Sequence, residues 1–194
     1  MAPPTHNLEK GARFNLSKEA PSLTKVKLGL GWEPNGFDTG QKHDLDVSVF
    51  ALGANGKIVD DRHFIYYNQL HTPNGSIRHG GDNRSGNAPG DDETIAIDLA
   101  LLDPTVVELS VIVTIDQAQS RGQNFGQIRN SGVRLYDAST GAVLAQYLLE
   151  EDFSTETAVQ FGSLYKRDGA WLFKAVGAGF RKGLADFVEA YTGG

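Results

Sequence analysis

The segment Val107-Glu-Leu-Ser-Val-Ile-Val-Thr-Ile115 decides the fold class, because apolar and polar residues alternate along it. The aliphatic residues at every second position are Val107, Leu109, Val111, Val113 and Ile115. Successive side chains of an extended strand point to opposite faces, whereas a helix repeats its apolar residues every three to four positions. The segment therefore predicts a β-strand with one face in a core.

The same alternation recurs along the chain between turns that contain glycine. Shorter strands are predicted over residues 26–30, 45–52, 63–67, 95–99, 133–136, 142–148, 159–165 and 171–176. Near the C-terminus, the apolar residues recur at the spacing of one helix face. They are Phe180, Leu184, Phe187, Val188 and Tyr191. Together these patterns predict an all-β fold, a two-sheet β-sandwich with a short C-terminal helix.

Length and charge narrow the function classes. A chain of 194 residues favours one domain, which we expect over residues 8–192 after a disordered tail over residues 1–7. The 18 basic and 24 acidic residues give a net charge of −6, which argues against nucleic acid as a partner. The chain has no cysteine, so thiolate catalysis and cysteine-ligated metals are excluded.

Hydropathy along the chain bears on its location. No apolar run approaches the roughly 20 residues that a membrane-spanning helix needs. The first ten residues show neither the basic flank nor the apolar centre of a signal peptide. We therefore expect a cytoplasmic protein without direct membrane insertion.

One segment, residues 80–93, interrupts the strand pattern. Its fourteen residues include four glycines and seven side chains with oxygen donors, and its net charge is −3. The residues with oxygen donors are Asp82, Asn83, Ser85, Asn87, Asp91, Asp92 and Glu93. Glycines let a backbone turn its carbonyls inward, so such a loop can direct carboxylate and main-chain oxygens to one point. This composition is typical of a site for a hard cation.

A second acidic cluster precedes the predicted strand over residues 45–52. If Asp44 and Asp46 open that strand, their side chains leave the same face with Cα atoms about 6.6 Å apart. Two carboxylates that converge to about 5 Å repel by roughly 3 kcal/mol at an effective dielectric constant of 20. Bound Ca²⁺ would turn this repulsion into attraction.

The types of donor indicate which metal to expect. An acidic, flexible set of oxygen donors suits Ca²⁺ better than Mg²⁺, which prefers a rigid octahedron. Zinc would require imidazole or thiolate ligands, and the five histidines are scattered along the chain. If Asp44 is the first position of a loop, the sixth position is Val49 and not the glycine that an EF-hand loop requires, so the segment is not an EF-hand loop. The alternative for both clusters is a solvated acidic loop that binds no metal.

From about Leu8 to Tyr191, the sequence resembles the tellurium-resistance TerD family of bacterial stress proteins. The motifs that carry the resemblance are Leu28-Gly-Leu-Gly-Trp32, Asp44-Leu-Asp46, Phe64-Ile-Tyr-Tyr-Asn68, Gly81-Asp-Asn-Arg-Ser-Gly86 and Gly90-Asp-Asp-Glu93. The resemblance implies a β-sandwich that binds one or two Ca²⁺ ions between loops. The ligands that it implies are Asp44, Asp46, Asp82, Asn83, Asp91, Asp92 and Glu93.

Three hypotheses for the function follow. The first is a non-catalytic stress-response protein, linked by the resemblance to tellurite resistance, in which Ca²⁺ orders loops that contact unidentified partner proteins near the membrane. The second is a Ca²⁺-dependent, lectin-like sandwich in which Trp32 stacks on a sugar. An enzyme ranks last, because the carboxylates are better explained as metal ligands and none is left as a general acid.

Overall fold

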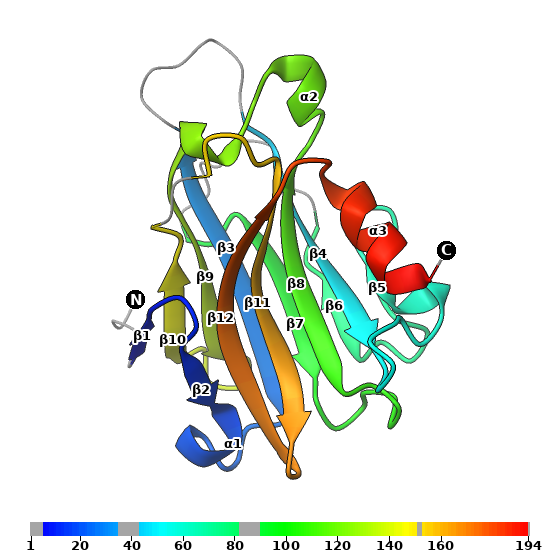
Figure 1. The fold of residues 1–194 in the computed structure, drawn as a ribbon. Coiled ribbons are helices and arrows are strands. Elements are labelled where there is room, and N and C mark those ends of the chain that lie inside the picture. Colours follow the sequence, from blue (N-terminus) through cyan, green and yellow to red (C-terminus); the bar gives the residue numbers. More distant parts are fainter. Residues whose placement is uncertain (1–5, 35–42, 82–89, 151–152, 194) are drawn as a thin grey trace.

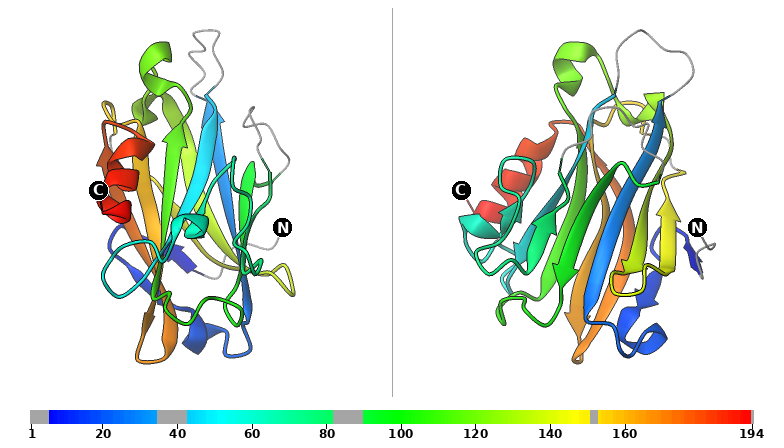
Figure 2. Two further views of the ribbon diagram at one scale, coloured as in Figure 1. Left: turned by 90° about the vertical axis from the view of Figure 1, so that its right-hand side faces the viewer. Right: turned by 180° about the vertical axis from the view of Figure 1, so that it is seen from behind.

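The computed structural model describes residues 6–34, 43–81, 90–150 and 153–193 (Figure 1). Two six-stranded sheets pack face to face, and the C-terminal helix lies on the outside of one of them (Figures 1 and 2). The prediction of a two-sheet β-sandwich with a short C-terminal helix is therefore confirmed.

The first sheet, sheet A, has the strand order β1-β10-β9-β3-β7-β6. Its strands are β1 (His6–Leu8), β3 (Lys25–Pro34), β6 (Ile77–His79), β7 (Glu93–Asp98), β9 (Ile128–Asp137) and β10 (Val143–Leu148). The second sheet, sheet B, has the order β2-β12-β11-β8-β4-β5. Its strands are β2 (Arg13–Asn15), β4 (Leu45–Leu52), β5 (Phe64–Ile65), β8 (Glu108–Ile115), β11 (Ala158–Arg167) and β12 (Ala170–Phe180). The helical elements are α1 (Leu16–Glu19), η1 (Asp61–His63), α2 (Ala118–Arg121), η2 (Phe125–Gln127) and α3 (Leu184–Thr192).

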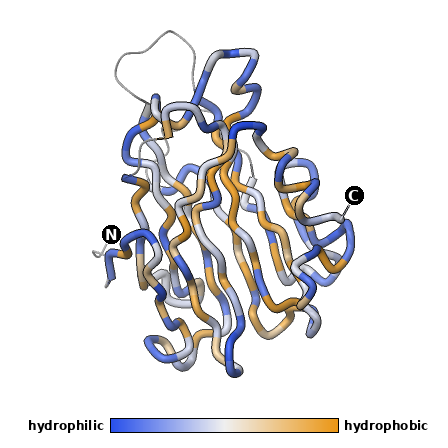
Figure 3. Tube along the Cα trace, viewed as in Figure 1, coloured by the Kyte–Doolittle hydropathy of each residue, from blue (hydrophilic) through white to orange (hydrophobic). Residues whose placement is uncertain are grey.

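The main core lies between the two sheets and is filled by the alternating aliphatic positions of the strands. In β8, Leu109, Val111 and Val113 are all at most 1% exposed. Figure 3 shows hydrophobic positions interspersed with polar ones along the central strands. The alternation that predicts β8 therefore has its expected cause, burial of one face of the strand.

A second, smaller core lies on the outer face of sheet B, beneath α3 (Figure 1). There Phe50 of β4 and Ile112 of β8 are fully buried in one cluster with Phe187 of α3. This cluster buries Phe50 and Leu52 on the outer face of β4. Every residue of β4 is buried, although alternation alone predicts that one of its faces meets solvent.

The structure differs from the predicted strands in three places. His6 and Asn7, assigned by the sequence to a disordered tail, form β1 and pair in parallel with Ala145 and Gln146 of β10. The strand predicted over residues 63–67 is instead the turn of 3-10 helix η1 followed by the two-residue strand β5. The short strands β1, β2 and β6 escape sequence analysis, because three residues are too few to show a period.

Candidate functional site

The first acidic cluster lies where β4 begins. Leu45 and Val47 of β4 belong to the core between the sheets, so Asp46 lies on the opposite, outer face, where it is 7% exposed. Asp44 is half-buried, and its carbonyl oxygen accepts a hydrogen bond of 2.8 Å from the backbone N–H of Asp116. That bond fixes the acidic segment to the chain just beyond the end of β8.

Glu93 brings the second acidic segment to the first. It begins β7 in the opposite sheet and is 1% exposed. Its Oε2 accepts a hydrogen bond of 2.6 Å from the backbone N–H of Val47. Strand β5 pairs with β4 only at Val49 and Phe50 and does not extend to Val47. The Glu93 side chain therefore reaches the edge of β4 at a position that β5 leaves unpaired. Glu93 therefore bridges the two sheets one residue away from Asp46.

His79 of β6 completes the contact with Val47. Its Nε2 lies 3.2 Å from the carbonyl oxygen of Val47 and 3.7 Å from Oε2 of Glu93. The backbone N–H of Gly81 donates to Nδ1 of His79 at 3.1 Å, which places the proton of a neutral ring on Nε2. In the sequence, His79 is only one of five scattered histidines, whereas the structure buries it beside a predicted ligand.

Asp92 directly precedes Glu93 in the chain and is 9% exposed. Its backbone N–H donates to the carbonyl oxygen of Leu30 at 2.7 Å, and its Oδ2 accepts from the backbone N–H of Trp32 at 3.2 Å. Trp32 itself is 3% exposed within the main core. The hypothesis that Trp32 stacks on a sugar is therefore wrong, because its ring is not available to a ligand at the surface.

Asp91 takes a different direction from its two neighbours. Its Oδ1 lies 2.8 Å from Nη1 of Arg134, and its Oδ2 lies 3.6 Å from Nζ of Lys27. A Cβ added at Gly29 would collide with the Asp91 carboxylate, so Asp91 lies directly against β3. Asp91 is thus held by cations of the outer face of sheet A, although the family resemblance implies it as a ligand.

Only part of the predicted ligand set can be placed. The structure brings the two acidic segments to the same edge of β4, and Asp82 and Asn83 lie outside the described residues. Within the described residues, no three His, Asp or Glu side chains form a group that could hold a metal ion. Carboxylates are hard oxygen donors of the kind that Ca²⁺ prefers, and in these two segments they come from Asp44, Asp46, Asp92 and Glu93.

A separate cluster of charged side chains surrounds Asp60, at the start of η1. The carboxylate accepts hydrogen bonds from the backbone N–H and Nη2 of Arg62, at 2.8 and 2.9 Å, and lies 3.0 Å from Nδ1 of His63. Hydrogen bonds from Arg62 and then from His63 hold the pKa of Asp60 well below its usual range. Because these bonds satisfy the carboxylate, we interpret the cluster as a cap of η1.

This cap predicts a pH dependence of stability. A carboxylate whose pKa is lowered by folding contributes stability above its unfolded-state pKa, about 3.9 for Asp, and loses it as the pH falls toward the folded-state value. We therefore expect Asp60→Asn to lower the free energy of unfolding at neutral pH, and the difference from wild type to shrink below about pH 4. Urea denaturation across this pH range measures both proteins, and a constant difference would contradict the assignment.

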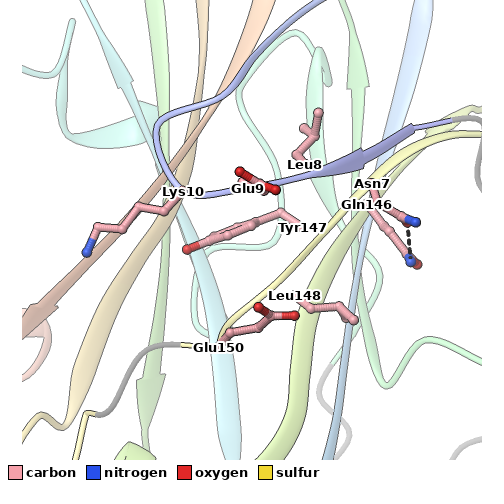
Figure 4. Close-up of a pocket in the computed structure, with 8 residues that line it drawn as sticks. All are labelled: Asn7, Leu8, Glu9, Lys10, Gln146, Tyr147, Leu148 and Glu150. Atoms are coloured by element: carbon pink, nitrogen blue, oxygen red, sulfur yellow. Dashed lines mark hydrogen bonds between the residues drawn. The ribbon is translucent and has the colours of Figure 1, made fainter.

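A surface pocket lies elsewhere, where β1 runs beside β10 (Figure 4). Within it, Nε2 of Gln146 donates a hydrogen bond of 2.7 Å to Oδ1 of Asn7. The lining residues are Asn7, Leu8, Glu9, Lys10, Gln146, Tyr147, Leu148 and Glu150, and none of the predicted ligands that the structure describes is among them.

In the described part of the chain, no helix combines the length and apolar character needed to cross a bilayer.

Comparison with known proteins agrees with this fold. A family model described as TerD domain matches residues 5–191. General stress protein 16U of Bacillus subtilis is 44% identical, covering 96% of this chain and 97% of its own length. A tellurium resistance protein TerD from an Alcaligenes species is 46% identical, covering 95% and 96%. The crystal structure of a Streptomyces coelicolor homologue of the telluride resistance protein has a TM-score of 0.69 at 24% identity, covering 88% of this chain and 96% of that one.

Proposed function

Since this chain belongs to the TerD domain family, we propose that it is a calcium-binding, non-catalytic stress-response protein linked to resistance to tellurite. The names of its relatives support the coarser part of this proposal, a role in stress response and tellurium resistance. We propose further that it acts in the cytoplasm, through partner proteins near the membrane. Calcium binding is the step that the site itself supports.

The observation that carries the proposal is the hydrogen bond from Val47 to Glu93, which joins the two acidic segments across the sheets. It places a buried carboxylate one residue from Asp46, itself 7% exposed. Two carboxylates with little access to water repel one another, and a divalent cation bound between them would neutralise their charge. The residues proposed to hold it are Asp44, Asp46, Asp92 and Glu93, with Asp82 and Asn83 as expected from the sequence.

The proposed ligands come from both sheets, and a functional consequence follows from this. Asp46 belongs to sheet B and Glu93 to sheet A, so an ion held by both would link the sheets at this edge. Ligand binding to the folded state alone stabilises that state, and it orders the segments that supply the donors. An ordered edge of this kind is the surface that we propose for a partner protein.

Melting curves test calcium binding directly. At a free Ca²⁺ concentration 100-fold above Kd, binding adds about 2.7 kcal/mol to the free energy of unfolding. For a chain of this size that raises Tm by roughly 5–11 °C relative to chelator. We expect Asp92→Asn to lose this shift, because it removes a charged donor.

Asp98→Asn is the matched control, since Asp98 ends the same strand, β7, and pairs with Lys25 at 3.5 Å, away from the site. It should retain the full calcium-dependent shift. Identical wild-type melting curves in calcium and in chelator would reject the proposal in favour of a solvated acidic edge.

A further inference from the structure

We infer that Asp91 is a positioning residue and not a calcium ligand, an inference that rests on the calcium-binding function proposed above. Three consecutive carboxylates, Asp91, Asp92 and Glu93, look equivalent in the sequence. The structure separates them by direction. Glu93 reaches Val47 in the opposite sheet, while Asp91 lies against the outer face of its own sheet.

Two cations hold the Asp91 carboxylate in place. Asp91 lies between Arg134 of β9 and Lys27 of β3, and we name these three residues the outer-face ion cluster. The Asp91 side chain is 5% exposed, so its carboxylate is mostly withdrawn from water. A carboxylate that left this place for a metal ion would leave two cations facing one another without their shared anion.

The surface of β3 also has a space that fits the Asp91 side chain. Gly29 of β3 has no side chain, and the Asp91 carboxylate occupies the space that a Cβ would fill. Tyr136 closes the cluster, because Nζ of Lys27 lies 3.8 Å from the centre of its ring and its hydroxyl lies 3.5 Å from Nη1 of Arg134. Burial, together with the neighbouring Asp91, raises the pKa of Tyr136, so its hydroxyl stays neutral at physiological pH.

The consequence concerns the two carboxylates that follow. Fixing Asp91 on β3 places Asp92 where its backbone N–H bonds Leu30 and its carboxylate bonds Trp32. Glu93 then enters β7 opposite Leu30, with its side chain directed to the edge of β4. The outer-face ion cluster therefore sets the direction of the proposed ligands and takes no part in coordination.

Calorimetric Ca²⁺ titration distinguishes the two roles. Loss of a group that orients metal ligands weakens affinity by roughly 10- to 100-fold. We expect Asp91→Asn to show such a loss with the number of bound ions unchanged. Arg134→Met should weaken binding in the same direction and add little in the double variant, because both changes break one interaction. Arg134→Lys retains the charge and should restore part of the affinity.

Two results would overturn the inference. One is loss of a bound calcium equivalent in Asp91→Asn, as expected for a ligand. The other is tighter calcium binding by Arg134→Met, because removing a cation that competes for a ligand frees that ligand. Asp98→Asn, which breaks the comparable pair with Lys25, should change neither affinity nor stoichiometry.

Hydrogen exchange in chelator tests positioning without calcium. The backbone N–H groups of Asp92 and Trp32 are both hydrogen bonded in the structure, and we expect Asp91→Asn to speed their exchange relative to wild type. If the wild-type protein binds no calcium, the proposed function is rejected, and hydrogen exchange in chelator then tests the positioning role of Asp91 by itself. Unchanged exchange of both amides would overturn the positioning role.

Discussion

Phe187→Ala is expected to lower the free energy of unfolding by about 3–5 kcal/mol, the usual cost of truncating a buried phenylalanine. Phe187 is 3% exposed and packs edge-on against Phe180, with ring centroids 4.3 Å apart. Among the described residues of α3, Phe187 alone is buried. It lies in the second core with Phe50 and Ile112 of sheet B. Its removal should therefore leave a cavity beneath the helix.

The effect should reach the whole domain, because the end of α3 is bonded to the sandwich. The backbone N–H of Ile58 donates to the carbonyl oxygen of Tyr191 at 2.9 Å, and Nζ of Lys57 donates to that of Ala190 at 2.6 Å. The Tyr191 hydroxyl also lies 3.0 Å from Oγ of Ser110 in β8. These bonds join the helix to the segment that follows β4 and to β8 of sheet B.

Urea denaturation followed by circular dichroism measures this prediction. A lower midpoint with an unchanged slope would show that stability alone has changed. Tyr67→Ala is the control, because Tyr67 is 44% exposed and its truncation should change stability by no more than about 0.5 kcal/mol. Loss of helix signal with an unchanged midpoint for the sheets would instead show that α3 unfolds independently.

The sequence predicts the parts of this fold whose signal is local. The alternation in β8 and the turns between β9 and β10, and between β11 and β12, are each contained in neighbouring residues, and the structure confirms them. The burial of both faces of β4 has no local signal. Phe50 is buried outward because α3, more than 130 residues later, covers it.

The candidate site divides in the same way. The family resemblance implies that the segments around Asp46 and Glu93 supply ligands to one site, and the structure brings Glu93 into contact with Val47. The sequence gives no reason to separate Asp91 from Asp92, since the difference depends on Arg134 in another strand. His79 is missed because its strand has three residues, too few to show that its side chain is buried.

Replacement of Glu93 is expected to separate its structural role from its proposed role as a ligand. In chelator, Glu93→Ala should lower the free energy of unfolding by roughly 1–3 kcal/mol, because the buried N–H of Val47 loses its acceptor. Glu93→Gln keeps a side-chain oxygen at the same position and should retain most of this stability. Both variants lack the carboxylate, so both should lose the calcium-dependent rise in Tm.

The pair of variants is informative because each readout has its own cause. Urea denaturation in chelator reports the hydrogen bond to Val47, while the shift in Tm on adding calcium reports the negative charge. A Glu93→Gln protein that is stable in chelator yet still gains several degrees in calcium would contradict the assignment of Glu93 as a ligand. The bridge between the sheets would then be structural alone, and calcium binding would have to rest on Asp44, Asp46 and Asp92.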